Sequence, residues 1–152
     1  MKTMDSMDDV LGSLGADLGT SDWVRIDQSR IDLFAEATGD HQWIHVDVER
    51  AKAESPFGST IAHGFLTLSM IPILSKDLFV VRGAKMAVNY GLNKVRFVSP
   101  VPVGSRIRLH SEVAAVDKTG DNTVNLTVRH TVQIEGNDKP AAVAELIARY
   151  VF

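Results

Sequence analysis

Two residues that can exchange protons with a substrate, Asp40 and His45, lie five positions apart within the stretch Thr38–Asp47. Carboxylates and imidazoles are the usual general acids and bases of enzymes. The preceding Gly39 predicts a helix end, because glycine adopts the left-handed C-cap conformation without strain. Proton-transfer chemistry in a loop is therefore one interpretation. In the structural alternative, Asp40 is an ordinary turn residue and His45 a histidine satisfied beside the next helix.

A metal site is the other chemistry that the histidines suggest. His41 and His45 are four residues apart, with Asp40 adjacent to the first, and His63 follows further on. Such spacing forms a ligand pair when both histidines lie on one helix. Because Gly39 predicts a break, and no His-Glu-x-x-His pattern exists, we expect no metal. We expect His63 to be structural, bonding the loop.

Helices are predicted on both sides of this loop. The earlier one shows an apolar face at helical spacing and ends at Gly39. Asp47 is a suitable N-cap for a second helix over residues 48–53, which Pro56 should end. A third helix, apolar on nearly all sides and therefore expected to be buried, is predicted from Ile61 to Leu74. Pro72 should kink that helix or begin its end.

Strands are predicted where the hydrophobic period changes from 3.6 residues to 2. After a short strand at 23–26, the long strands are expected at approximately 86–97, 106–115, 124–134 and 142–152. A phase change in the first long strand predicts a bulge near Asn93-Lys94. Residues 117–121 are a predicted turn between the second and third long strands.

The order of these elements, helices first and then long antiparallel strands, predicts an α+β fold in which a sheet wraps one apolar helix. With 152 residues the chain fits a single domain, 1–152. Residues 1–20 form an expected N-terminal helical extension, since Val10, Leu14 and Leu18 recur at helical spacing.

Composition excludes several classes of function and partner. A net charge of −3 provides no basic field for nucleic acid. The absence of cysteine excludes a disulfide scaffold and thiolate chemistry, and fits a reducing compartment. The acidic N-terminus does not resemble a signal peptide, and no apolar run reaches the ~18 residues of a membrane span. We therefore expect a cytoplasmic protein without a membrane span.

Spaced motifs carry a resemblance to a known family. The stretch from Phe34 to Ala51, with its Thr-Gly-Asp, Ile-His and final alanine at fixed spacing, resembles the hydratase-2 signature of the MaoC-like (R)-specific enoyl-CoA hydratases. Residues 61–66 resemble that family's next block, and a Pro-Val…Gly turn at 100–104 falls where the family usually has one. The resemblance implies a hot-dog fold and a homodimer with thioester tunnels near the subunit interface.

The resemblance also implies roles for individual residues. It marks Asp40 and His45 as the catalytic pair and the backbone N–H of Gly64 as the group that holds the thioester carbonyl. One departure is that the family commonly has Asn-Pro where this chain has Gln42-Trp43. This replacement puts the loop conformation and the acyl pocket's shape in question, and Trp43 fits the core as well as the pocket.

Substrate contacts are expected from Gln42, Trp43, Phe65 and Arg96. Coenzyme A is then part of the substrate, and no separate cofactor is expected. Its phosphates require cations, for which the candidates are Arg82, Lys85, Lys94, Arg96, Arg106 and Arg108. A solvated strand face explains most of these charges equally well. Coenzyme A and an acyl carrier protein both remain possible acyl carriers.

Hydration of an enoyl thioester is consistent with these groups. Adding water to C3 needs a base, a proton donor for C2, and stabilisation of the charge that gathers on the thioester oxygen. Asp40 can take the water proton and His45 can deliver one to C2, with roles reversed for dehydration, but which group moves which proton stays open. The alternatives are a hot-dog thioesterase and a noncatalytic acyl-thioester binding module.

Overall fold

The computed structural model describes residues 1–152. Its main sheet contains β2 (Asp17–Thr20), β3 (Val24–Arg25), β5 (Met86–Phe97), β6 (Arg106–Gly120), β7 (Thr123–Ile134) and β8 (Ala142–Val151). The strand order is β2-β6-β7-β8-β5, with β3 also paired to β6, and every pairing is antiparallel. A separate parallel pair joins β1 (Lys2–Met4) to β4 (Phe79–Val81).

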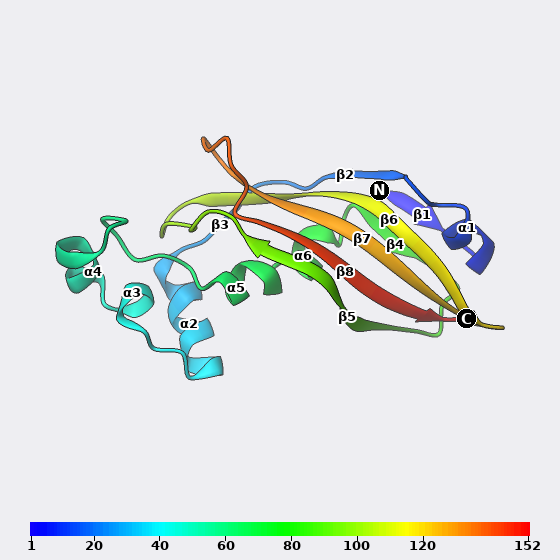
Figure 1. Cartoon of the computed structure of the whole chain (residues 1–152), viewed down its shortest axis with the longest axis horizontal. Helices are drawn as coiled ribbons and strands as arrows, with labels where there is room; N and C mark the ends of the chain where they lie inside the picture. Colours follow the sequence, from blue (N-terminus) through cyan, green and yellow to red (C-terminus); the bar gives the residue numbers. More distant parts are fainter.

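Six short helices accompany the sheet: α1 (Met7–Leu11), α2 (Gln28–Thr38), α3 (Trp43–Val46), α4 (Val48–Glu54), α5 (Gly64–Ser69) and α6 (Ile71–Ser75). Helices α2, α3 and α4 gather at one end of the molecule (Figure 1). The β1–β4 pair and α1 lie at the opposite end, where the chain also terminates. The loop between α2 and α4 is therefore held at one end of the long sheet.

The core forms where α5 and α6 pack on the sheet. Leu66, Met70 and Leu74 recur every four residues and are at most 5% exposed. They share one apolar cluster with residues of β6, β7 and β8, including Leu109 and Val132. Full burial of such a side chain stabilises the fold by ~1.5–3 kcal/mol. The predicted α+β class, with an antiparallel sheet packed around an apolar helical segment, is confirmed.

The apolar helical segment differs from its prediction in two ways. It begins at Gly64 instead of Ile61, because Ile61 forms a bridge with Pro102. It divides into α5 and α6 at Met70, directly before the Ile71-Pro72 pair, so the predicted interruption at the proline is confirmed. The prediction that this segment is buried on nearly all sides was wrong for the single chain, since Phe65 and Ile73 are more than half exposed.

The N-terminal prediction also needs correction. The expected helix covers only Met7–Leu11, because Gly12 caps it, and the chain turns at Gly15 with a positive φ. Residues 17–20 then become β2, which buries Leu18 while its backbone bonds to β6. Strand pairing satisfies the backbone groups of this glycine-diluted segment better than an isolated helix would.

Strand β6 is longer than predicted. Residues 117–120, expected to be a turn, continue β6, and the reversal lies at Asp121-Asn122. Pairing with β7 provides their backbone partners, which local turn propensity cannot anticipate. The bulge predicted at Asn93-Lys94 is confirmed by a register shift between Leu92 and Lys94, and a second shift lies near Tyr90.

Both predicted helix boundaries around the loop are confirmed. Gly39 caps α2 in the left-handed conformation, with φ 78°, and its N–H bonds to Ala35. Asp47 caps α4 by accepting a hydrogen bond from the Arg50 N–H. The one-turn helix α3 between them was not predicted. These caps determine where the loop leaves one helix and enters the next.

We predict that Gly39→Ala lowers the free energy of unfolding by ~1 kcal/mol or more, because alanine at positive φ is strained. Gly12→Ala is the matched control, since Gly12 also caps a helix but does so with an ordinary φ of −81°. Urea unfolding at one fixed protein concentration measures both. Equal destabilisation by the two variants would contradict the role of the left-handed cap.

Candidate active site

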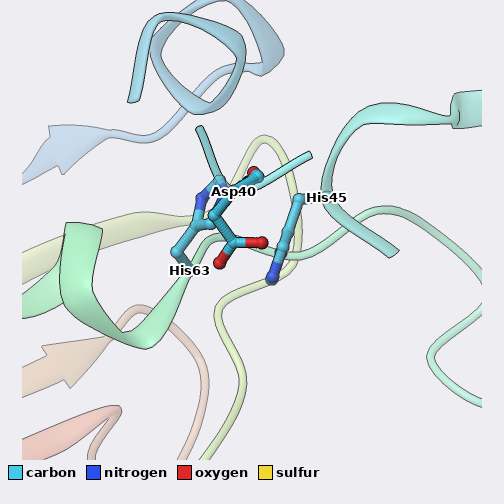
Figure 2. Close-up of side chains that lie close together, drawn as sticks. All are labelled: Asp40, His45 and His63. Atoms are coloured by element: carbon cyan, nitrogen blue, oxygen red, sulfur yellow. The ribbon is translucent and has the colours of Figure 1, made fainter. Parts of the chain in front are cut away.

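Asp40, His45 and His63 come together beneath the loop, as Figure 2 shows. One carboxylate oxygen of Asp40 and one ring nitrogen of each histidine lie within 4.8 Å of one another. Asp40 is exposed, whereas His45 is 7% exposed and His63 is 2% exposed. The cluster therefore presents an accessible carboxylate against two buried imidazoles.

His45 is held by a hydrogen bond from its Nδ1 to the Ile61 carbonyl, at 2.7 Å. A carbonyl can only accept, so the bond requires the proton on Nδ1 and leaves Nε2 as an acceptor in the neutral ring. Burial lowers the pKa of His45 below its ordinary value of 6.5, and the nearby His63 lowers it further. The Ile61 bond and Asp40 oppose that shift. His45 is thus a neutral imidazole with a free acceptor nitrogen.

His63 joins the loop to the start of α5. Its Nε2 donates to the Asp40 carbonyl at 3.0 Å, so the prediction that His63 bonds the loop is confirmed. Its ring stacks on His45, with centroids 3.8 Å apart and an interplanar angle of 25°. Its Nδ1 is buried without a hydrogen-bond partner. The neighbouring glycine in the Ala-His-Gly stretch was the signal that could have assigned His63 to the site.

Hydrogen bonds connect the loop to the segment 60–63. Besides the two histidine bonds, the Ile61 N–H donates to the Ile44 carbonyl at 3.0 Å. Gln28, on α2, adds a third element: its side chain donates to the His45 carbonyl at 2.8 Å and accepts from the Thr60 hydroxyl. The sequence did not single out Gln28, because its partners lie 17 and 32 positions away.

A cavity of about 260 Å³ opens beside this cluster. His45 and Gly64 both line it, and Phe97 from β5 forms part of the opposite wall. Gly64 is the first residue of α5, so its N–H has no partner within the helix, and no side chain caps it. A Cβ at Gly64 would come within 2.9 Å of the Phe97 ring, so only glycine fits this contact.

The expected substrate-contact residues lie outside the walls of this cavity. Gln42 is exposed at the start of α3, and Trp43 is half-buried beneath the Arg50 guanidinium, 4.3 Å from its ring centre. Phe65 is 67% exposed and meets Phe97 edge to face. Arg96 is exposed on β5. Their contacts with substrate remain predictions.

Metal binding is poorly matched by the geometry of this cluster. Imidazole lone pairs lie in the ring planes, and two rings that stack at 25° do not direct those planes toward one ion. His41, which suggested a metal by its spacing, turns to the surface, where Nε2 lies 3.6 Å from Glu36. The arrangement is better matched to proton transfer by the Asp40 carboxylate and the His45 imidazole.

Comparisons with known proteins give the family and the fold of the chain. Residues 9–135 match the family described as MaoC like domain. The chain is 56% identical over 151 residues to 3-hydroxyacyl-thioester dehydratase Z of Mycobacterium tuberculosis strain H37Rv, covering 99% of each chain. The structure of a monoamine oxidase regulatory protein from Archaeoglobus fulgius superimposes with a TM-score of 0.83 at 23% identity. The match covers 99% of this chain and 96% of that chain, and at such low identity the similarity indicates the fold alone.

An R-hydratase, PhaJ1 from Pseudomonas aeruginosa, has a TM-score of 0.67 at 25% identity, covering 89% of this chain and 79% of its own. The fold is thus the hot-dog fold, and the chain is a hydratase or dehydratase of that class. The chain belongs to the MaoC-like dehydratase family. No helix of the structure is long and apolar enough to cross a membrane.

We predict opposite tautomers for the two stacked histidines. Nitrogen NMR of labelled histidine should show His45 as the Nδ1–H form and His63 as the Nε2–H form, because each bonds a carbonyl through that nitrogen. His45 should titrate below its ordinary 6.5, since burial disfavours its charged form. His45→Gln and His63→Asn assign the signals. An Nε2–H tautomer of His45 would contradict the site geometry.

Proposed function

We propose that this protein hydrates trans-2-enoyl thioesters of coenzyme A to (R)-3-hydroxyacyl thioesters and catalyses the reverse dehydration. The observation that carries the proposal is the pairing of an exposed carboxylate, Asp40, with a buried neutral imidazole, His45, beside a cavity that Gly64 also lines. The family membership and the 56% identity to a 3-hydroxyacyl-thioester dehydratase support it.

The reacting water sits between Asp40 and Nε2 of His45 in this proposal. Both groups accept hydrogen bonds, so together they orient both hydrogens of the water and direct its oxygen to C3 of the substrate. Nε2 takes one proton as the hydroxyl adds to C3, and the resulting imidazolium returns that proton to C2. Each turnover thus leaves His45 neutral, as its burial favours. Dehydration follows the same steps in reverse.

Gly64 contributes through its backbone. Its N–H, the first of α5, is a donor without a partner in the helix, and Gly64 lines the same cavity as His45. In this position it can donate a hydrogen bond to the thioester oxygen and stabilise the negative charge of the enolate. One such donor typically accounts for ~10²–10³-fold in rate.

Arg96 and Lys94 are the better candidates for the phosphates of coenzyme A. Both lie exposed on β5, close in sequence to Phe97 of the cavity wall, and neither forms an ion pair. Arg82 and Arg106 are already neutralised by Asp5 and Glu135, at 3.8 and 3.1 Å. Arg108 lies over the ring of Trp23 and bonds Gln133.

We also propose a homodimer formed through the free edge of β5. This strand ends the sheet, and Met86, Val88, Tyr90 and Leu92 remain 44–56% exposed along it. A long apolar edge strand is a surface that proteins normally pair or cover. The same strand provides Phe97 to the cavity, so a partner there would lie close to the substrate.

Hydration of crotonyl-CoA, followed by loss of the enoyl absorbance, tests the catalytic pair. Asp40→Asn and His45→Gln should each reduce kcat by ~10²–10⁴-fold, because each removes one group that handles the water. Asn keeps an acceptor for the Gln42 N–H, and Gln keeps a donor for Ile61, so both variants should fold. The double variant should be little worse than either single one, because the two groups act as a unit.

His41→Gln is the matched control, because His41 is an exposed histidine of the same loop, and it should retain the full rate. A folded Asp40→Asn or His45→Gln enzyme with full activity would refute the proposed pair. Release of free thiol with the double bond intact would indicate a thioesterase instead. Stabilisation by crotonyl-CoA without turnover would indicate a binding module.

Val88→Lys should weaken the proposed dimer, because it places a charge on the apolar edge of β5. Leu33→Lys is the control, since Leu33 is 70% exposed on the distant helix α2. Sedimentation velocity over a range of concentrations should show a dimer for the wild type and the control, and dissociation for Val88→Lys. A monomeric wild type would contradict the proposal.

A further inference from the structure

Three hollows lie in succession along one stripe of α5 and α6. The stripe follows helical spacing and contains Gly64, Thr67, Leu68, Ile71, Pro72 and Ser75. Its first two residues line the cavity at His45, Leu68 lines the next hollow, of about 320 Å³, and Ile71 and Ser75 line the third, of about 280 Å³. The opposite wall includes Phe97 of β5 in the first hollow, β5 and Leu146 of β8 in the second, and residues of β4, β7 and β8 with Asn89 of β5 in the third. The hollows therefore follow one direction away from the loop.

The second and third hollows share wall residues. Pro72, Asn89 and Leu146 line both, so the two are adjacent. The α5–α6 segment rises by ~1.5 Å per residue, which places the level of Ile71 ~10 Å beyond that of Gly64. An acyl chain of ten carbons, with bonds of ~1.5 Å in a zigzag, is long enough to reach the third cavity from a thioester held at Gly64.

The wall of the third cavity is mainly apolar but contains one buried imidazole. Phe79, Val128 and Ala148 represent its apolar part, while Ser75, Lys76, Asn89 and Tyr150 are its other polar residues. His130 is 2% exposed, and its Nδ1 lies 2.8 Å from the Ser111 hydroxyl. Its Nε2 forms no hydrogen bond within the protein, and it is not one of the fully buried polar atoms that lack a partner, so it retains some exposed surface. Nε2 therefore faces the cavity.

The hydrogen bond to Ser111 determines which nitrogen carries the proton. Ser111 is fully buried, and its hydroxyl has no acceptor other than Nδ1 of His130. Leaving that hydroxyl proton unpaired in the core would be unfavourable, so Ser111 donates to Nδ1 and the ring proton resides on Nε2. Burial lowers the pKa of His130 to about 4, which keeps the ring neutral. The cavity thus receives a neutral N–H donor.

We propose that the third cavity binds the far end of the acyl chain and that Nε2–H of His130 donates to an oxygen substituent there. The enzyme then prefers acyl thioesters whose chain carries a hydroxyl or oxo group near its end. The inference rests on the proposed function for the position of the thioester. A plain hydrocarbon end would displace water from this N–H without replacing its hydrogen bond, and such a mismatch reduces binding.

Isothermal titration calorimetry with two saturated thioesters tests this preference without requiring turnover. Decanoyl-CoA and ω-hydroxydecanoyl-CoA have the same chain length and differ only in the terminal oxygen. Wild-type protein should bind the hydroxylated thioester about tenfold more tightly, which corresponds to ~1.4 kcal/mol. The double variant Ser111→Ala/His130→Phe removes both partners of the buried bond while keeping ring shape, and should bind the two thioesters equally.

Equal affinities in the wild type would overturn the proposal, and this outcome does not depend on whether the double variant folds. A preference that survives in a folded double variant would also overturn it, because the donor would then be another residue. Crotonyl-CoA hydration by the wild type reports the proposed reaction separately. If the wild type shows the tenfold preference but does not hydrate crotonyl-CoA, the proposed reaction is refuted and the proposed role of the third cavity is supported. If it hydrates crotonyl-CoA but binds the two thioesters equally, the reaction is supported and the role of the cavity is refuted.

Discussion

The hydrogen bond between Nδ1 of His45 and the Ile61 carbonyl connects the chemistry of this protein to its fold. The bond fixes the tautomer of the His45 imidazole, and its acceptor is a carbonyl of the segment 60–63. That segment is itself bonded to the turn before β6: Ala62 donates to Val101, and Val103 donates to Thr60, at 2.8 and 2.9 Å. The position of the imidazole is therefore set by the sheet, although His45 lies outside it in the one-turn helix α3.

Burial gives the same site its electrostatic character. His45 and His63 stack at 3.8 Å, so protonation of both would place two cations in contact away from water. The pKa of His45 is lowered by its burial first and by His63 second. Asp40, by contrast, is exposed to solvent. A neutral acceptor next to an accessible anion is a suitable arrangement for orienting one water molecule.

The division of the apolar helical segment at Met70 has structural consequences beyond a kink. Pro72 cannot donate a backbone hydrogen bond, so α5 ends before it and α6 begins with it near the first position. Both short helices nevertheless keep one stripe toward β5 and β8 and another, with Leu66 and Leu74, toward the core. One stripe stabilises the fold while the other leaves a row of hollows.

Local signals allowed much of the fold to be predicted from sequence. Gly39, Asp47 and Pro72 act on backbone groups within one helical turn, so the C-terminal end of α2, the start of α4 and the interruption before α6 were predicted correctly. Strand periodicity gave the four long strands, although the extent of β6 was wrong because only its pairing with β7 decides it. Motif spacing nominated Asp40 and His45 before any contact was known.

The sequence by itself determined which residues could carry the chemistry and where the main helices and strands lie, since both follow from residue type and short spacing. Only the tertiary structure decided that His63 joins the site, that His45 presents Nε2, and that His130 directs a donor into a cavity. These properties depend on partners 16 to 23 positions away. Folding brings such groups together through the packing of the sheet and the helices, which no local pattern encodes.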